Sequence, residues 1–372
     1  MGSVRSPAPD RFDVTTGAPA LDLLDDAWDA LAARTPSPFL TGAWLRSWWE
    51  QYGSGAPAVA VLRAPDGRLR AGAMFSHSRF GLSAAANDHS PHWGAVSDGP
   101  DAAAALWSEI GRLPEPVVTL TALAAGDDEQ HARAALQACG RRVHVRQGIE
   151  SPFLELPSSF DELLAERSAN LRSQVRSRQR RMERAGVTQV RTVRGADDLP
   201  AALEAFLRVE ASGWKAREGT AIATEARAAG LYRSFARQAA ERGWLRLHLL
   251  ELDGVAVAGD LACVLGDTEF LLKTGFDEAH ARLSPGLVLR ANALRAAIEE
   301  GVAAYDFLGG PDAYKLRWTD VVRSRVTVRG FRGARSLPSE AWWRTVRPAL
   351  VATRDHLPEH LPVASAARDT TA

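Results

Sequence analysis

One stretch of the sequence decides the fold: residues 269–320, which read EFLLKTGFDEAHARLSPGLVLRANALRAAIEEGVAAYDFLGGPDAYKLRWTD. Residues Glu269 to Phe276 place apolar side chains on alternate faces and predict a strand. Ser284-Pro285-Gly286 is typical of a helix start, with Ser as N-cap and Pro at the first helical position, and Gly301 ends that helix. A short apolar strand from Ala303 to Leu308 follows. Strand, helix and strand form a βαβ unit, so we expect the two strands to be parallel.

The start of the helix in such a unit lies at the carboxyl end of the first strand, where open α/β sheets bind ligands. Free backbone N–H groups and the helix dipole favour an anion there. The same pattern is also typical of an ordinary crossover that binds nothing. The βαβ unit by itself favours that plainer interpretation.

The composition indicates a soluble globular protein. The chain has 372 residues, of which 46% are apolar and 24% charged, and it is long enough for two domains. Lys+Arg and Asp+Glu both number 45, so no overall charge favours DNA or an anionic membrane. The sequence has neither an apolar run of about 20 residues nor an apolar N-terminal segment, so we expect no membrane helix, no secretory signal and a cytoplasmic protein. Cys139 and Cys263 lie far apart, which disfavours a disulfide framework or a zinc site.

The order of the expected elements divides the chain into two similar halves. The second half gives the order β-α-α-β-β-β-α-β-α-β, and the first half nearly repeats it. We therefore predict an α/β (α+β) fold of two tandem domains, residues 1–150 and 151–335, each with a mixed central sheet flanked by helices. Residues 336–372 are expected to form a C-terminal helix and a flexible tail.

In the first half, the patterns predict a helix from Leu21 to Ala33, a loop from Gly81 to Gly99 and a strand from Arg142 to Arg146, with the domain junction near residues 147–160. His89 and His92 lie in the predicted loop. No third ligand is evident beside them, so a metal site is disfavoured and we expect no metal cofactor.

A long helix from Phe160 to Ala185 carries the one concentrated basic patch of the sequence. Its arginines are Arg167, Arg172, Arg176, Arg178, Arg180, Arg181 and Arg184. A solvated helix face is the default interpretation of such a run. A docking surface for phosphate, tRNA or an acidic polymer is the sharper alternative.

The Gly266-Asp267 turn predicts a hairpin register in which Asp260 lies opposite Lys273. Asp260 is flanked on its face by small alanines. An acid and a lysine facing each other in mid-sheet are either a buried structural pair or the floor of a site, and the pattern leaves both open.

Other candidate residues carry groups suited to proton transfer or charge stabilisation. Glu210 lies at the edge of the apolar face of its helix, where burial would raise its pKa toward that of a general base; a structural pair with Lys215 or Arg217 is the alternative. Tyr314 and Lys315 follow the second parallel strand, where a phenol can protonate a leaving group and an ammonium can neutralise negative charge.

Several motifs, taken in order along the chain, resemble a known family. They are FLTGAWLRSWWEQYG near residue 40, WKAREGTAI at 214, the SPG helix start at 284 and YDFLGGPDAYKLRW at 305. The element order of the second half resembles the GCN5-related N-acyltransferase (GNAT) fold. The motifs are similar to the acetyltransferase-like family associated with bacterial cellulose biosynthesis (BcsL/CelD type), which is related to the Fem-type aminoacyl transferases. The resemblance covers roughly residues 20–335.

The resemblance implies transfer of an acyl group, such as acetyl from acetyl-CoA or another acyl-CoA, to a small-molecule or saccharide amine or hydroxyl. The thioester would lie between the two parallel strands. The implied roles are donor binding by Arg282, Ser284, Gly286 and Leu287, acceptor binding by Trp214, Lys215 and Asp306, acid catalysis by Tyr314, base catalysis by Glu210 or Asp260, and charge stabilisation by Lys273 and Lys315.

One departure from the family leaves the donor open. The usual acyl-CoA loop reads Arg/Gln-x-x-Gly-x-Gly/Ala, whereas residues 281–286 here read ARLSPG, with one glycine and with Pro285 in place of an N–H donor. Aminoacyl-tRNA is therefore an alternative donor, as in Fem-type relatives, although the neutral net charge argues against tRNA. A third alternative is a non-catalytic binding or scaffold module.

Overall fold

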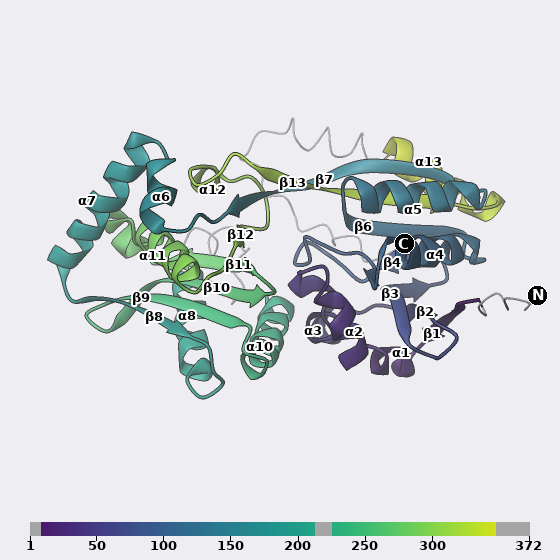
Figure 1. Cartoon of the computed structure of the whole chain (residues 1–372), viewed down its shortest axis with the longest axis horizontal. Helices are drawn as coiled ribbons and strands as arrows, with labels where there is room; N and C mark the ends of the chain where they lie inside the picture. The colour runs from purple at the N-terminus through teal and green to yellow at the C-terminus, as the bar shows by residue number, and fades with distance from the viewer. Residues whose placement is uncertain (1–8, 213–224, 347–372) are drawn as a thin grey trace, which may run out of the picture.

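The computed structural model describes residues 9–212 and 225–346, which form one long mixed sheet with helices on both faces (Figure 1). The strands are hydrogen-bonded in the order β1-β2-β3-β4-β6-β13-β7-β12-β11-β10-β9-β8, and β5 pairs with β3. Their bounds are β1 Arg11–Thr16, β2 Ala56–Arg63, β3 Leu69–Ser78, β4 Gly81–Ala84, β5 Val96–Ser97, β6 Val117–Ala124, β7 Arg142–Glu155, β8 Thr188–Val193, β9 Leu245–Leu252, β10 Val255–Leu265, β11 Thr268–Phe276, β12 Ala304–Asp306 and β13 Val322–Phe331. The predicted α/β class with a mixed sheet flanked by helices is confirmed.

The helices follow the same local signals that the sequence carries. Their bounds are α1 Ala18–Asp22, α2 Asp26–Ala32, α3 Gly42–Tyr52, α4 Pro100–Arg112, α5 Asp127–Ala138, α6 Phe160–Ala165, α7 Ala169–Ala185, α8 Leu199–Ala211, α10 Ala226–Glu241, α11 Pro285–Glu299, α12 Ala313–Leu316 and α13 Leu337–Ala341, with 3-10 turns η1 Pro38–Leu40 and η3 Glu278–Leu283. None of these described helices is both long enough and apolar enough to cross a membrane.

Three local predictions need correction. The predicted helix from Leu21 to Ala33 is two short helices, because Asp25 caps α2 by accepting a hydrogen bond from the Trp28 N–H. The predicted helix from Phe160 to Ala185 likewise breaks in two, because Ser168 caps α7. The predicted loop from Gly81 to Gly99 contains two short strands, β4 and β5.

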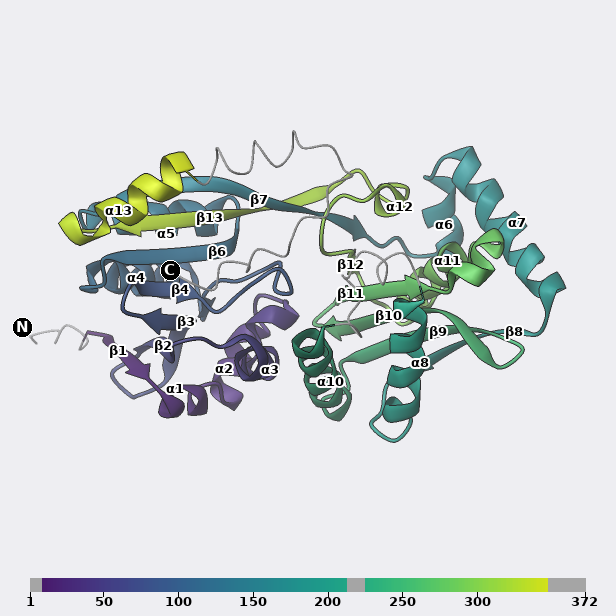
Figure 2. The ribbon, with the colours of Figure 1, turned by 180° about the vertical axis from the view of Figure 1, so that it is seen from behind.

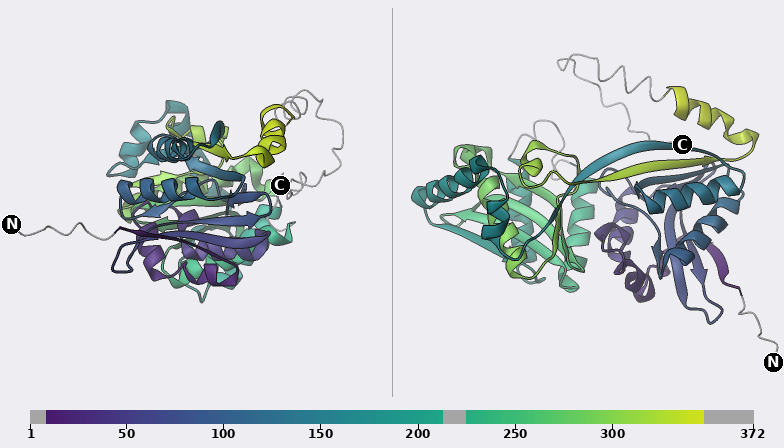
Figure 3. Two further views of the ribbon diagram at one scale, coloured as in Figure 1. Left: turned by 90° about the vertical axis from the view of Figure 1, so that its right-hand side faces the viewer. Right: turned by 45° about the horizontal axis from the view of Figure 1, so that its top comes forward.

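Two long strands join the halves of the molecule. The predicted strand Arg142–Arg146 extends to Glu155, so β7 pairs with β13 over most of its length and with β12 at its end. Strand β13 comes from the end of the chain yet lies between β6 and β7 (Figures 1 and 3). The sheet is therefore continuous across the predicted domain junction, and the last strand of the sequence packs in the first half.

The two halves also contact each other through helices. Helix α3 of the first half packs against α10 of the second, side by side in Figure 2. The ring of Trp44 lies 5.0 Å from that of Phe235, and Gln238 Nε2 donates a hydrogen bond to Ser47 Oγ at 2.9 Å. One apolar core runs through this contact, so the halves share buried surface.

Strands β11 and β12 are parallel, as predicted, but they pair over a short distance. Their register runs from Thr268↔Ala304 to Phe270↔Asp306. Strand β12 then ends, and Leu308 and Gly309 take positive φ angles of 50° and 58° that turn the chain aside. Residues 271–276 of β11 therefore have no strand partner on this edge within the described chain.

The predicted pairing of Asp260 with Lys273 is wrong. Leu265 pairs with Thr268 as the turn requires, but the register shifts between Leu261 and Ala262, so Asp260 pairs with Thr274. A β-bulge inserts one residue, and a shift of one residue moves a side chain to the other face of a sheet. Asp260 and Lys273 therefore lie on opposite faces.

Helices cover both of those faces. Asp260 contacts α11 through a hydrogen bond from Arg290, whereas a Cβ on the preceding Gly259 would lie 2.7 Å from Phe206 of α8. Consecutive strand residues point to opposite faces, so α11 lies on one face of β10 and α8 on the other.

Candidate functional site

The open edge of β11 is the feature around which the predicted site residues gather. Residues 271–276 present backbone N–H and C=O groups toward the space that β12 vacates after Asp306. Unpaired edge groups of this kind accept an extended ligand as an additional strand. Strands β11 and β12 therefore separate after Phe270 and Asp306, which leaves a gap between them.

Helix α11 begins at Pro285, as predicted, close to the far end of this open edge. A Cβ placed on Gly286 would lie 3.5 Å from Phe276 Cδ1, at the end of β11. Ser284 takes a left-handed φ of 57°, and its side chain makes no capping hydrogen bond. A non-glycine residue in this conformation is strained, and strain of this kind gathers at ligand-binding positions.

Few backbone amides at the start of α11 are free to bind an anion. Pro285 has no N–H, and the amides of Leu287 and Val288 donate to the Ser284 carbonyl at 3.1 and 3.3 Å. The amide of Gly286 donates to no backbone carbonyl in the described chain. Arg282, in the preceding turn η3, lies beside α7, because its carbonyl accepts a hydrogen bond from Arg181 at 3.2 Å. The four predicted donor-binding residues thus surround one short turn.

A buried ion pair lies beneath α11 on one face of β11. Arg290 Nη2 donates to Asp260 Oδ1 at 3.0 Å, and Arg290 Nη1 donates to the Tyr305 hydroxyl. Arg290 is 3% exposed and Asp260 1%. Asp260 Oδ2 and Arg290 Nε have no hydrogen-bond partner among the described residues. Asp260 therefore pairs with Arg290 and not, as predicted, with Lys273.

The charges of Arg290 and Asp260 also act on the pKa of Tyr314, which lies on α12. Burial by itself would lower the pKa of Arg290, but Asp260 first, and then Tyr305 and Tyr314, raise it, so the guanidinium stays charged. Burial raises the pKa of Tyr314 above that of an ordinary phenol, although Arg290 opposes the shift. The Tyr314 hydroxyl therefore stays protonated at neutral pH, which a proton donor requires.

Glu210 and Lys273 lie on the other face of the same strand. Glu210 is 2% exposed and packs on Gly275, where a Cβ would come within 2.7 Å of the Glu210 Cα. The Lys273 ammonium lies 5.3 Å from the ring centre of Tyr232 on α10. Glu210 also acts on Tyr232, whose pKa is raised well above normal by burial and then by Tyr52 and Glu210. Trp214 and Lys215, predicted to bind the acceptor, lie outside the described residues.

Lys315 stabilises the turn at residues 308–310, where the chain leaves β12. Its ammonium donates to the carbonyls of Leu308 at 2.8 Å and Gly310 at 2.9 Å and pairs with the Asp312 carboxylate at 2.8 Å. It is 5% exposed. These contacts occupy the three donors of the ammonium. The geometry supports a role for Lys315 in holding the turn after β12.

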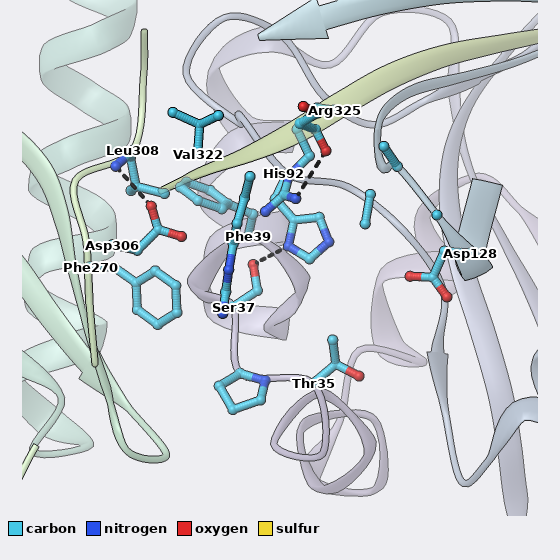
Figure 4. A pocket seen from close by; sticks show the side chains of 16 residues that line it. Thr35, Ser37, Phe39, His92, Asp128, Phe270, Asp306, Leu308, Val322 and Arg325 are labelled. Carbon is cyan, nitrogen blue, oxygen red and sulfur yellow. Dashed lines mark hydrogen bonds between the residues drawn. The ribbon is translucent and has the colours of Figure 1, made fainter. Parts of the chain in front are cut away.

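Asp306, the last residue of β12, points away from α11 into a cavity of about 640 Å³ between the halves (Figure 4). Its carboxylate accepts a hydrogen bond from the Leu308 N–H at 2.9 Å. Its neighbour Tyr305 faces Arg290, so the two residues lie on opposite faces, as consecutive strand residues do. Asp306 thus stands where the cavity meets the opening of the β11–β12 gap.

Sequence reasoning missed Arg290 and, apart from Asp306, the residues that line the cavity. Arg290 lies three residues after Leu287 and four before Leu294, on the buried face of α11, and an arginine within an apolar stripe is the signal that could have identified it. His92 belongs to the cavity, where its Nδ1 lies 2.9 Å from Ser37 Oγ. Only the folded chain brings Ser37 and His92 beside Asp306.

Comparisons with known proteins agree with this geometry. Residues 169–316 match the family model of the acetyltransferase (GNAT) domain. This range contains β11, α11, β12 and the turn after it. No curated protein matches the chain in sequence.

Several solved structures share the fold over most of the chain. FemX is 15% identical with a TM-score of 0.59, covering 81% of this chain and 94% of its own. The C-terminal domain of a protein described as a lysylphosphatidylglycerol synthetase, from Agrobacterium fabrum, is 13% identical with a TM-score of 0.55, covering 90% and 95%. L-PGS from Bacillus licheniformis is 13% identical with a TM-score of 0.51, covering 84% and 95%. These identities are low, so the likeness concerns the fold, which is that of a GNAT-type acyltransferase.

Proposed function

We propose that this chain, whose second half matches the GNAT domain, transfers an acyl group from acyl-CoA to an amine or hydroxyl. The acyl group is acetyl in our proposal, and the acceptor a small molecule or saccharide precursor of the cell envelope. The observation that carries the proposal is the unpaired edge of β11 at residues 271–276, which lies between the end of β12 and the start of α11. An open strand edge can bind the amide-containing arm of an acyl-CoA, and a helix N-terminus can bind its phosphates.

The donor would bind with its amide-containing arm along the open edge of β11. Its phosphates would lie at the turn of Arg282, Ser284 and Gly286. Since Pro285 lacks an N–H and two of the next amides are engaged, the Gly286 amide and the Arg282 side chain carry this contact. We therefore expect weaker phosphate binding than a loop with several free amides would give.

In the proposed reaction, the acceptor nitrogen or oxygen attacks the thioester carbonyl and the carbon–sulfur bond breaks. Glu210 takes the proton of the acceptor, because it packs at Gly275 beside the open edge, whereas Asp260 is engaged with Arg290. Tyr314 gives its hydroxyl proton to the departing thiolate and is reprotonated from solvent. The raised pKa of Tyr314 keeps its hydroxyl protonated at neutral pH, and the residue is 41% exposed, so solvent can return the proton.

Hydrogen–deuterium exchange with and without acetyl-CoA tests where the donor binds. We expect slower exchange at residues 271–276 and 284–290 and little change in β1–β3 of the first half. Unchanged exchange in both segments at saturating acetyl-CoA would overturn the proposal.

Replacing Tyr314 with Phe should lower the rate of CoA release about 100-fold, because the substitution removes the proton donor and keeps the ring. Leu316→Ala, on the same short helix, is the matched control and should stay near the wild-type rate. Because the pKa of Tyr314 is raised, the wild-type rate should show no decline near pH 10, the ordinary pKa of a phenol. An unaltered rate in Tyr314→Phe would exclude Tyr314 as the proton donor.

A Fem-type transferase that uses aminoacyl-tRNA is the second candidate, and the basic helix α7 favours it. Arg176, Arg180 and Arg181 are exposed, and α7 lies against η3 and α11, beside the proposed donor turn. This alternative predicts tRNA binding that weakens steeply with salt and is lost when these three arginines become Glu. Filter binding decides the question: salt-independent or absent binding by the wild type would exclude it.

A further inference from the structure

The cavity between the halves is built from segments far apart in the sequence. Its walls come from η1 and the residues before it, His92, the β6–α5 junction, Phe270 near the start of β11, the end of β12 and the start of β13 (Figure 4). A volume of about 640 Å³ is that of a small-molecule site. None of its lining residues belongs to the turn that we propose for the donor phosphates.

Arg325 is a buried cation whose guanidinium has no hydrogen bond to a carboxylate among the described residues, although Asp306 and Asp128 lie near enough to act on its charge. It is 8% exposed, its Nε has no hydrogen-bond partner among the described residues, and Nη1 reaches only the Ser324 carbonyl at 3.4 Å. Burial lowers its pKa, which reflects the cost of a charge removed from water. A buried guanidinium in this state is strongly stabilised by a bound anion.

Arg323 adds a second cation to the same wall. Its guanidinium lies 3.2 Å from the ring centre of Phe153, which fixes its plane beside the cavity. Arg323 is exposed as a residue, and partial burial of its guanidinium lowers its pKa, whereas Asp306 acts in the opposite direction. The two arginines, separated by one residue on β13, suit the oxygens of a carboxylate or phosphate.

His92 contributes a neutral polar group. It is 8% exposed, and its Nδ1 lies 2.9 Å from Ser37 Oγ. Burial lowers its pKa well below the usual value, and Arg325 and Arg323 lower it further. The imidazole therefore stays uncharged at neutral pH and can exchange a hydrogen bond with a ligand without adding charge.

Two carboxylates limit which ligand can fit. Asp128 lines the cavity at the start of α5, and Asp306 lies at the opposite end, beside Phe270 and Leu308. A ligand with negative charge throughout would meet both. A ligand can pair with both ends of the cavity if its anionic group lies at the two arginines and its amine or hydroxyl lies at Asp306. The amine or hydroxyl then lies near the opening of the β11–β12 gap.

We propose that this cavity is the acceptor site, and that the acceptor is an amine or hydroxyl compound carrying a carboxylate or phosphate group, which Arg325 and Arg323 bind. This inference rests on the proposed acyl transfer. It adds the chemical class of the acceptor and a subsite built jointly by the first half and β13.

Ligand-detected NMR tests the site with three probes: glucosamine 6-phosphate, glucuronate and glucose. We expect at least one of the two anionic probes to bind and glucose not to bind, and the better anion identifies phosphate or carboxylate. Arg325→Gln should weaken that binding tenfold or more, the loss of a charge-assisted hydrogen bond, and Arg325→Lys should weaken it less. Arg79→Gln is the matched control, because Arg79 is an exposed arginine outside the cavity.

The melting temperature of Arg325→Gln shows whether the variant is folded, and its affinity for acetyl-CoA should stay within twofold of the wild type. Anion binding that is absent in the wild type, or equal in Arg325→Gln and wild type, would overturn the anion site. If the anions bind but acetyl-CoA does not, the acceptor role is overturned together with acyl transfer, and the anion-binding cavity alone stands.

Discussion

Replacement of Arg290 with methionine is expected to lower the free energy of unfolding by about 3–5 kcal/mol, the usual cost of removing one partner from a buried ion pair. Arg290 and Asp260 are both almost completely buried, and their contact of 3.0 Å lies between α11 and β10. The methionine would leave the Asp260 carboxylate without a cation and the Tyr305 hydroxyl without a donor. Urea denaturation of the two proteins measures the difference.

Two further variants distinguish the effect of losing the ion pair from the effect of losing side-chain volume. Arg295→Met lies on the same helix but is exposed, and it should cost less than about 1 kcal/mol. Combining Arg290→Met with Asp260→Leu should recover much of the loss, because the double variant buries no unpaired charge. If Arg290→Met is as stable as Arg295→Met, the buried pair contributes little and the account of this face is wrong.

Replacement of Gly286 with tryptophan should weaken acetyl-CoA binding at least about 100-fold, which corresponds to about 2.7 kcal/mol. Gly286 stands where α11 meets the end of β11, and its amide is the one we expect to contact phosphate. An indole at this point would occupy the space between the helix start and Phe276. Fluorescence competition with a labelled CoA measures the affinity.

Gly286→Ala is the matched control for this effect. A Cβ at this position meets Phe276 Cδ1 at 3.5 Å, an ordinary van der Waals distance, so the alanine variant should fold and bind acetyl-CoA within a few-fold of the wild type. Equal affinity in the tryptophan variant and the wild type would show that the donor binds elsewhere.

Local signals were sufficient to predict the central unit of the fold. The alternating strand at 268–276, the Ser-Pro-Gly helix start and the short strand before Gly309 each depend on neighbours in sequence, and all three appear where expected. The parallel pairing of β11 and β12 follows from the connection between them. The local signals predict the two parallel strands, whereas a thioester site between them was implied only by the family resemblance.

The register of the hairpin could not be predicted in the same way. The turn fixes the pairing of Leu265 with Thr268, but the register shifts between Leu261 and Ala262, where Leu272 of β11 is the extra residue of a bulge. No residue near the shift marks the bulge, because Leu261, Ala262 and Leu272 are all ordinary strand residues. One inserted residue was sufficient to separate Asp260 from Lys273.

The joining of the halves also depends on contacts distant in sequence. Residues 147–155 contain Gly148 and Pro152, which resemble a linker, yet they continue β7 because β13 pairs with them. The same long-range pairing places Arg323 and Arg325 in the cavity with His92 and Ser37. Apart from Asp306, the cavity residues therefore had no signal in any single stretch.

Calorimetric titration of the wild-type protein with acetyl-CoA, at low and at moderate salt, tests the central claim most directly. We expect one site per chain, with micromolar affinity that falls modestly as salt rises, because the donor contacts the open edge of β11 as well as the phosphate turn. A folded protein that shows no heat of binding at either salt concentration would contradict acetyl-CoA as the donor.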